Sequence, residues 1–321
     1  MSFFSDVERD LVVATRTPLA DGVVAVDLVA PNGRDLPAWT PGSHIDVRVA
    51  PDTERQYSLC GDPTDRSRWR VAVLREDAGR GGSVAAHEQI AVGDRVRVRG
   101  PRNHFGFDPQ TTPAPVFVAG GIGITPIRVM VEAAARAGLD WRLHYAGRSR
   151  RAMAFADELL ALDPDRVTLY AADEGARLDL PAVVAGLPDD AQVYACGPLR
   201  LTEELDALTQ GSPDGRLHSE HFVAREFGAP VWTEPFEVEL ALRGETVTVP
   251  PERSILDVLD DAGVLVPSSC RRGTCGSCET PVLEGEVEHR DSVLTPAEQA
   301  DSLTMMVCVS RAAGPKLVLD L

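Results

Sequence analysis

Alternation of apolar and polar residues marks two separate parts of this chain. Residues 93–101 alternate with the period of two that a pleated strand imposes, which predicts a strand with one buried face, and residues 70–75 are predicted to form another strand. Residues 236–240 and 246–249 alternate in the same way on either side of Gly244, a residue suited to a tight turn. The sequence therefore predicts β structure in the first third of the chain and a β-hairpin in its last third.

The middle of the chain has a different pattern, in which almost continuous apolar runs lead into helices. Residues 115–119 form such a run, followed by a glycine turn at 120–123 and a helix predicted over 127–137. Residues 192–196 form another, followed by a helix predicted over 199–208. Strands that alternate with helices indicate a parallel sheet, and a glycine turn before a helix presents backbone N–H groups to a pyrophosphate. Two further strands of this sheet are predicted, at 141–146 and 167–170.

Four cysteines near the C-terminus carry the most specific chemical signal. Cys270-x4-Cys275-x2-Cys278 is followed by Cys308 after 29 further residues, which is the ligand spacing of a plant-type [2Fe–2S] cluster. A zinc ribbon would bring a second Cys-x2-Cys or a His pair, and Cys308 stands alone. A thioredoxin-like site would place its cysteines at the start of a helix, whereas glycines punctuate residues 268–278. The spacing therefore predicts an electron-carrying cluster, with zinc as the alternative.

Composition and charge limit the possible functions. The 321 residues suffice for two or three domains, and 44% hydrophobic with 25% charged residues is a soluble globular balance. No apolar run reaches the ~18 residues of a membrane span and residues 1–6 lack a secretory signal, so we expect a cytoplasmic enzyme. The formal net charge of −17 argues against nucleic-acid binding. Residues 235–321 hold 15 Asp and Glu against 7 Lys and Arg, an acidity that would steer toward a basic partner or serve solubility alone.

The motifs and their order resemble a known family. Residues 235–321 are similar to plant-type ferredoxins, and Ser254 is the predicted N-cap of a short helix that Gly263 closes. The glycine turn together with Tyr194-x-Cys196-Gly197-Pro198 resembles the pyridine-nucleotide domain of the ferredoxin–NADP reductase superfamily. Over its whole length, the chain resembles the phthalate dioxygenase reductase family.

That resemblance implies a multidomain protein with three folds in a fixed order. An antiparallel β-barrel flavin domain would occupy residues 1–108, and an α/β nucleotide domain with a parallel sheet would occupy residues 109–225. A linker at 226–234, rich in Gly and Pro, would lead into an α+β β-grasp ferredoxin domain at 235–321.

The resemblance also implies an FMN site in the barrel. Arg55-Gln56-Tyr57-Ser58 matches the family motif in which the arginine binds the flavin phosphate and the tyrosine and serine lie against the isoalloxazine. The absence of a separate adenine-stacking aromatic residue after Ser83 favours FMN over FAD. Phe222 matches an aromatic residue near the flavin, although it could equally belong to a core. The implied FMN-binding residues are Arg55, Gln56, Tyr57, Ser58, Val73, Leu74, Gly81, Gly82, Ser83, Thr125 and Phe222.

An NADH site is implied at the two glycine turns of the parallel sheet. In the family the turn at 120–123 receives the pyrophosphate, and the 196–198 loop lies beside the nicotinamide, although Cys196 could instead be an inert buried cysteine. Arginines at 148–151 could hold the 2′-phosphate of NADPH, whereas Asp173 and the family pattern favour NADH. The implied residues are Gly120, Gly121, Gly123, Pro126, Arg148, Ser149, Asp173, Cys196, Gly197 and Pro198.

The expected function is an electron relay in which a flavin accepts a hydride from NADH and a [2Fe–2S] cluster passes single electrons onward. Hydride transfer needs no acid–base residue, so none is assigned. Members of this family supply electrons to Rieske non-haem iron oxygenases. We expect the protein to be a monomer. Three alternatives remain open: a haem-thiolate monooxygenase as partner, a stand-alone flavin or quinone reductase, and a redox sensor without turnover.

Overall fold

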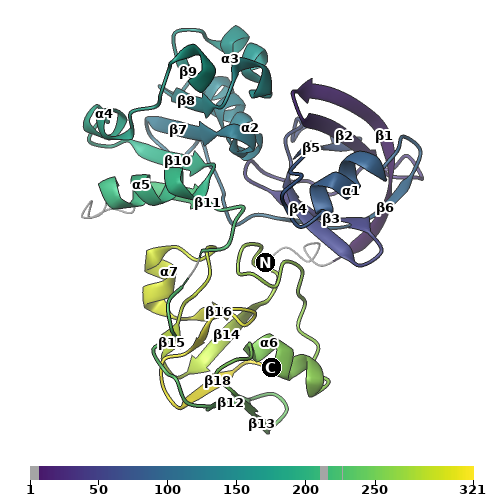
Figure 1. Ribbon diagram of the computed structural model, residues 1–321, viewed down its shortest axis with the longest axis vertical. Helices are drawn as coiled ribbons and strands as arrows, with labels where there is room; N and C mark the ends of the chain where they lie inside the picture. The colour runs from purple at the N-terminus through teal and green to yellow at the C-terminus, as the bar shows by residue number, and fades with distance from the viewer. Residues whose placement is uncertain (1–6, 210–215, 226) are drawn as a thin grey trace. The chain divides into compact units, whose positions relative to one another are not determined.

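The computed structural model describes residues 7–209, 216–225 and 227–321, which belong to two compact units, Met1–Glu220 and His221–Leu321 (Figure 1). Residues 1–6 of the predicted barrel and residue 226 of the predicted linker lie outside the described residues. The multidomain prediction is confirmed, because the first unit contains an antiparallel and a parallel sheet and the second contains a sheet of its own. The domain limits at 108 and 225 stay predictions.

The first sheet of the N-terminal unit is antiparallel throughout, in the order β4-β3-β6-β1-β2-β5. A bridge between Leu59 and Val71 joins the chain just after β4 to β5, which brings the two edge strands together as a barrel requires. The elements are β1 Glu8–Ala20, β2 Val23–Val29, β3 His44–Ala50, β4 Thr53–Ser58, β5 Arg68–Leu74, α1 Gly82–Glu88 and β6 Arg95–Arg102.

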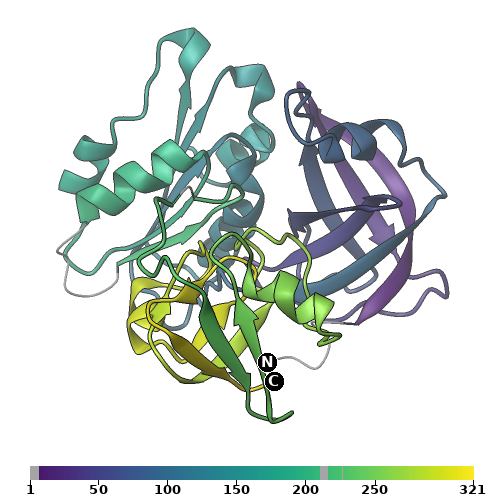
Figure 2. The same cartoon turned by 60° about the horizontal axis from the view of Figure 1, so that its bottom comes forward.

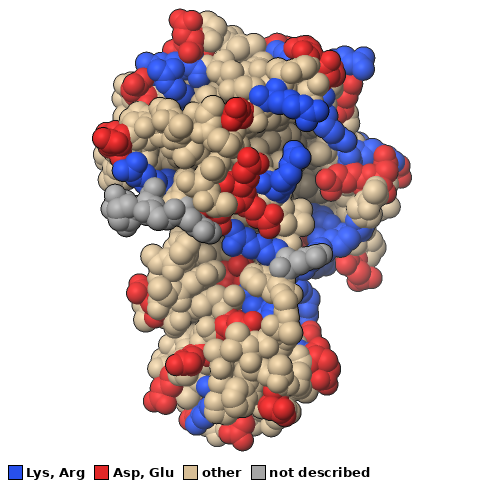
Figure 3. Space-filling view, turned by 60° about the vertical axis from the view of Figure 1, so that its left-hand side comes forward, with Lys and Arg blue, Asp and Glu red and all other residues tan. Residues whose placement is uncertain are grey.

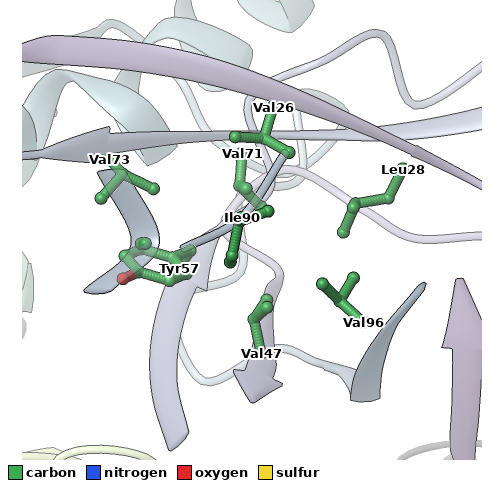
Figure 4. Close-up of a pocket in the computed structure, with 9 residues that line it drawn as sticks. Val26, Leu28, Val47, Tyr57, Val71, Val73, Ile90 and Val96 are labelled. Atoms are coloured by element: carbon green, nitrogen blue, oxygen red, sulfur yellow. The ribbon is translucent and has the colours of Figure 1, made fainter. Parts of the chain in front are cut away.

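Apolar side chains fill the interior of this barrel. Ile45, Trp69 and Val98 are fully buried there. Figure 4 shows a small cavity among aliphatic side chains from several strands, with the ring of Tyr57 beside them. The cavity lining carries no charged residue, so the barrel interior serves packing, and polar ligands have to bind outside it.

The second sheet of the N-terminal unit is parallel throughout, in the order β11-β10-β7-β8-β9. Phe117 packs with Ile127 of α2 in one hydrophobic cluster, and Val118 packs with Leu180 of α4 and Leu205 of α5 in another, so helices cover both faces. The elements are β7 Pro115–Gly120, α2 Ile124–Arg136, β8 Arg142–Gly147, α3 Ala156–Leu162, β9 Val167–Ala171, α4 Leu180–Ala185, β10 Gln192–Cys196, α5 Leu199–Thr209 and β11 Leu217–Glu220.

The helix after the first glycine turn starts earlier than the sequence predicted. A 3₁₀ turn at Gly121–Gly123 runs directly into α2, which begins at Ile124 and ends at Arg136. Pro126 is tolerated because it lies in the first helical turn, where a backbone N–H has no partner within the helix. The turn and the helix are therefore continuous at the predicted pyrophosphate site.

The C-terminal unit has a mixed sheet in the order β13-β12-β18-β14-β16 (Figure 2). The predicted hairpin is confirmed: β12 and β13 pair antiparallel around Gly244, whose φ is +66°. Ser254 caps α6 by accepting a hydrogen bond from the Asp257 N–H, as predicted. The elements are β12 Phe236–Leu240, β13 Glu245–Val249, α6 Ile255–Asp261, β14 Glu279–Glu284, β15 Val287–Glu288, α7 Pro296–Asp301, β16 Thr304–Met306, β17 Arg311–Ala312 and β18 Lys316–Leu319.

Among the described residues, we find no helix whose length and apolar character would let it cross a membrane.

Candidate functional site

Arg55 lies against the start of α1. Its guanidinium donates to the carbonyl of Glu54 at 2.8 Å and to that of Arg80 at 3.2 Å. A Cβ at Gly82 would overlap this side chain, with the guanidinium carbon only 2.7 Å away. Gly81 adopts the left-handed conformation with φ +78°, which glycine reaches without strain. The predicted phosphate residues are thus brought together, and a side chain at position 82 would force Arg55 to shift.

Tyr57 and Ser58 continue β4 from Arg55. The Tyr57 hydroxyl is buried and has no hydrogen-bond partner among the described residues, and burial raises its pKa to about 12. A buried hydroxyl without a partner is unusual and fits a site whose ligand supplies the missing partner. Together with the Arg55 and Gly82 arrangement, this hydroxyl makes the strand suitable for a flavin.

The remaining residues predicted for FMN have varied surroundings. Val73 lines the barrel cavity with its side chain, so it can offer a flavin only its backbone. The Ser83 hydroxyl accepts from the Glu76 N–H at 3.0 Å. Phe222 belongs to the C-terminal unit and is 42% exposed, which excludes the alternative of a core residue there, while its place near the flavin stays a prediction. Gln56 bonds Asp46, and Leu74 packs beside the parallel sheet's core.

Two predicted nucleotide turns lie in contact at the ends of neighbouring strands. Cys196 of β10 is in register with Ala119 of β7, so the loops that follow both strands meet. A Cβ at Gly123 would overlap the Cys196 carbonyl and lie 2.7 Å from the Gly197 nitrogen. A Cβ at Gly120 would lie 2.6 Å from a ring carbon of Pro198. Glycine is therefore required by close packing of the two loops at the carboxyl edge of the sheet, where such folds bind ligands.

Gly121 and Thr125 complete this edge. Gly121 has φ +55°, and its carbonyl accepts from the Tyr145 hydroxyl at 3.2 Å. The Thr125 hydroxyl donates to the Ile122 carbonyl at 2.9 Å and is buried, so it braces the turn from inside. A backbone held on both sides in this way is pre-organised for a pyrophosphate.

The residues expected near the adenosine ribose are joined by the backbone. The Asp173 N–H donates to the Arg148 carbonyl at 3.2 Å, and Ser149 lies at the N-terminus of the 3₁₀ turn that follows. Arg150 pairs with Asp157 at 2.5 Å, and Arg151 pairs with Asp21 at 3.5 Å. Two of the three arginines thus form ion pairs with carboxylates at the protein surface, and Arg151 stays largely exposed.

Glu220 was not among the predicted site residues, yet it lies between the flavin strand and the nucleotide loops. It ends β11, in register with Cys196 of β10. Its carboxyl group accepts from the Ser58 hydroxyl at 3.4 Å and from the Cys196 thiol at 3.9 Å. Glu220 keeps some exposed surface, but protein atoms surround its carboxyl group. The loss of solvent around the carboxyl raises the pKa of Glu220 to about 8. Burial likewise raises the pKa of Cys196 well above its usual value, and Glu220 adds to this shift.

No local sequence signal distinguishes Glu220 from the many other acidic residues of this chain. Only its place at the end of a fifth parallel strand, next to Cys196, marks it. Its contacts at Ser58 and Cys196 show that the predicted flavin and nicotinamide residues meet within one compact unit.

The four cysteines come together at the surface loop between α6 and β14. The thiols of Cys275 and then Cys308 lie within hydrogen-bonding reach of Cys270 and lower its pKa, and Cys308 also contacts Cys278. Backbone N–H groups of Arg272 and Thr274 point at the Cys270 sulfur, at 3.3 and 3.4 Å. Backbone donors around thiolates are the environment that iron–sulfur clusters use.

The spacing of the four cysteines favours a [2Fe–2S] cluster over zinc, because such a cluster distributes four thiolates over two irons. Glycine is again required in this loop, since Gly273 has φ +71° and a Cβ there would lie 2.6 Å from the Val309 side chain.

Charges near the cysteine loop are largely paired. Arg271 binds Asp257 at 2.8 Å and Asp260 at 2.7 Å, and Arg253 binds Asp261 at 2.7 Å. Figure 3 shows acidic and basic side chains interspersed on the face in view. The net negative charge of this region therefore does not mean that unpaired acidic side chains surround the cysteines.

Comparison with known proteins identifies the class. Residues 238–313 match the model of the 2Fe-2S iron-sulfur cluster binding domain. The chain is 46% identical over 303 residues to the phenoxybenzoate dioxygenase subunit beta of Ectopseudomonas oleovorans, covering 94% of each chain. A nucleotide-binding fold, a flavin-reductase barrel and a [2Fe–2S] domain in one chain define a flavin- and pyridine-nucleotide-linked iron–sulfur oxidoreductase.

Solved structures define the family more closely. Phthalate dioxygenase reductase, described as a modular structure for electron transfer from pyridine nucleotides to [2Fe–2S], is 38% identical with a TM-score of 0.69 and 98% coverage of both chains. The chain belongs to this family of oxygenase reductase subunits. It is also 47% identical, with a TM-score of 0.93, to part of a type IV self-sufficient cytochrome P450 monooxygenase; 98% of this chain matches 41% of that one.

Proposed function

We propose that this chain takes a hydride from NADH onto FMN and delivers single electrons through its [2Fe–2S] cluster to a separate oxygenase, with a Rieske non-haem iron enzyme as the first candidate. The observation that carries the proposal is the junction at Glu220, where the end of flavin strand β4 meets the nucleotide loop at Cys196. A flavin at this junction would supply the conversion from two-electron to one-electron transfer.

Each cofactor is assigned to particular residues in this proposal. Arg55 and the turn at Gly81-Gly82 would hold the flavin phosphate, and Tyr57 and Ser58 would contact its ring system. The glycine turns at 120–123 and 196–198 would receive the nucleotide. Cys270, Cys275, Cys278 and Cys308 would ligate the cluster.

Preference for NADH is supported by the charges after β8 and β9. Asp157 and Asp21 already engage Arg150 and Arg151, and Asp173 bonds the Arg148 backbone through its own N–H. A 2′-phosphate would therefore meet carboxylates beside these arginines, although both ion pairs are exposed and weak. Catalytic efficiency with NADH should exceed that with NADPH, and a preference for NADPH would refute this choice.

We propose the following domain boundaries: a flavin domain at 1–108, a nucleotide domain at 109–225, a linker at 226–234 and a ferredoxin domain at 235–321. The proposed location is the cytoplasm, because four cysteines that ligate iron require the reducing conditions that keep thiolates available.

An anaerobic NADH titration of the purified protein tests the proposal. Visible absorbance should show flavin bleaching, low-temperature EPR should show a one-electron cluster signal, and extraction should yield FMN. A flavin that bleaches while the cluster stays oxidised would favour a stand-alone flavin or quinone reductase instead.

A haem-thiolate monooxygenase is the second candidate partner. The supporting observation is the 47% identity with the matching part of a type IV self-sufficient cytochrome P450 monooxygenase. This candidate would be favoured if the protein, in the presence of NADH, reduced a purified P450 and did not reduce a Rieske oxygenase.

A further inference from the structure

Asp291 is a buried carboxylate beside the cysteine loop of the C-terminal unit. Its side chain is fully buried, and its Oδ2 accepts hydrogen bonds from the Val293 N–H at 3.0 Å and the Leu294 N–H at 2.8 Å. Its Oδ1 accepts from the Ser310 hydroxyl at 3.3 Å and lies 3.7 Å from Nδ1 of His289. Both oxygens of the carboxylate therefore have polar neighbours, as a buried charge requires.

The surroundings of Asp291 keep it negatively charged at neutral pH. Burial alone would raise its pKa, but the His289 ring and the N–H groups of Leu294 and Val293 stabilise the charged form and hold the pKa of Asp291 below its ordinary value. Because water does not reach this carboxylate, salt and solvent screen its charge less than that of a surface carboxylate.

On one side, Asp291 touches the loop between Cys270 and Cys275. A Cβ at Gly273 would lie 3.0 Å from the Asp291 Cα, and the Ser292 N–H donates to the Gly273 carbonyl at 2.8 Å. Cys275 is two residues from Gly273, which puts their Cα atoms at most about 8 Å apart. The Cα atoms of Asp291 and Cys275 are therefore within about 12 Å of each other.

On the other side, Asp291 reaches the segment that follows Cys308. Ser310 lies two residues after Cys308 and is fully buried. Its hydroxyl donates to Asp291, and the oxygen of the same hydroxyl accepts from the Arg290 N–H at 3.1 Å. Asp291 thus joins the two parts of the chain that carry the four cysteines.

We propose that Asp291 is a positioning residue for the [2Fe–2S] cluster: its carboxylate joins the two cysteine-bearing segments, and its negative charge lowers the reduction potential of the cluster. Reduction adds an electron to the cluster, so a negative charge nearby disfavours the reduced state. The inference rests on the cysteine ligands of the proposed function, but it does not depend on NADH, on the flavin or on a partner.

Asp291→Asn tests the role of the charge. The amide oxygen can accept from the two backbone N–H groups, and the amide nitrogen can donate to the Ser310 oxygen, so this variant keeps the joining contacts. Removal of a unit charge at about 12 Å, with an effective dielectric constant of about 20, changes an equilibrium constant about tenfold. A dithionite titration of the holoprotein, followed by EPR, should therefore give a potential about 59 mV higher than that of the wild type, the one-electron equivalent of a tenfold change.

Asp301→Asn is the matched control. Asp301 is exposed at the end of α7 in the same unit, so solvent screens its charge and its loss should leave the potential unchanged. A wild-type potential in Asp291→Asn would overturn the role of the charge. Loss of the cluster from Asp291→Asn would also overturn it, by showing that the carboxylate serves folding instead.

Ser310→Ala tests the joining contact, because it removes the hydroxyl and keeps the charge of Asp291. Release of iron to a chelator should become about tenfold faster, as expected for loss of a hydrogen bond to a charged group, while the potential stays close to that of the wild type. Thr248→Val, which removes an exposed hydroxyl from β13, should release iron at the wild-type rate. Release at the wild-type rate from Ser310→Ala would overturn the joining role.

Dithionite bypasses NADH and the flavin, so these measurements are independent of the proposed relay. If dithionite reduces the wild-type cluster and NADH does not, the relay is wrong, while Asp291→Asn and Ser310→Ala still decide the role of Asp291. A wild-type protein without a [2Fe–2S] signal would refute the ligand assignment and the role of Asp291 together.

Discussion

Glu220 is the residue whose protonation most directly links the site to pH. Its carboxyl contacts Ser58 and Cys196, and desolvation raises its pKa from 4.5 to about 8. The folded protein therefore holds a proton on Glu220 at neutral pH, whereas the unfolded chain releases it near the ordinary value. A neutral carboxyl can donate a hydrogen bond as well as accept one, so the site offers a proton close to where hydride transfer is proposed.

Replacing Glu220 with Gln should remove one source of pH-dependent stability. For an acid whose pKa rises on folding, the stabilisation is complete below about pH 4.5, declines between about pH 4.5 and 8, and stays lost above that. The unfolding midpoint of the wild type should therefore fall relative to that of Glu220→Gln as pH rises from 5 to 8. Calorimetry across that range checks this, with the exposed Glu203→Gln as control. Parallel curves for wild type and Glu220→Gln would contradict the raised pKa.

Gly82 decides whether Arg55 can occupy the predicted phosphate site. In Gly82→Ala the new Cβ would overlap the guanidinium, so FMN affinity should fall roughly tenfold to a hundredfold, the cost of disturbing a charge-assisted contact. Extracted flavin per protein and fluorescence titration measure the loss. Gly314→Ala, where a Cβ meets nothing within 4 Å, is the control. The cluster absorbance should persist in both variants, and full flavin content in Gly82→Ala would remove Arg55 from the site.

At the scale of elements, the contact between the loops after β7 and β10 forms the predicted nucleotide site. The strands are parallel neighbours, so their carboxyl ends lie at one edge of the sheet, and glycines let the following loops touch. Elements more than 70 residues apart thus build one surface, and its shape depends on backbone contact rather than on charged side chains.

Gly123→Ala should separate these loops. A Cβ there would overlap the Cys196 carbonyl, and overpacking of this kind costs about 1–3 kcal/mol. We expect the KM for NADH to rise about tenfold with flavin content unchanged. Gly186→Ala, at the end of α4 where the nearest atom lies 3.5 Å away, serves as the control. Steady-state kinetics at several NADH concentrations gives the answer, and an unchanged KM would show that the loops yield without cost.

At the scale of the whole molecule, the two compact units divide the proposed chemistry. Glu220 ends the unit with the flavin and nucleotide residues, and the cysteines lie in the other. Function should therefore separate cleanly when one unit is damaged.

Cys308→Ser should abolish or destabilise the cluster without affecting flavin reduction. The Cys308 thiol contacts both Cys270 and Cys278, so its loss removes one of four ligands. NADH should still bleach the flavin at the wild-type rate, while the EPR signal and electron delivery disappear. Cys60→Ser, which changes a buried cysteine in the N-terminal unit, should retain the cluster. A normal cluster signal in Cys308→Ser would refute the ligand assignment.

Features that depend on local pattern or fixed spacing could be predicted without the structure. The hairpin around Gly244, the Ser254 cap, the parallel sheet and the cysteine spacing were all readable, because periodicity, capping and ligand spacing act over short stretches of chain. The resemblance of the ordered motifs then supplied the family, which the comparisons confirm.

Contacts between distant residues could not be predicted in this way. Burial raises the pKa of Glu220, and its carboxyl accepts a hydrogen bond from Ser58, 162 residues away; local sequence encodes neither the burial nor this contact. The requirement for glycine at positions 82 and 123 comes from Arg55 and Cys196, which approach from other strands. The Arg290 guanidinium likewise donates a hydrogen bond to the Gly228 carbonyl across 62 residues of chain. Such contacts arise from packing of complete elements, so they become visible only when the chain is folded.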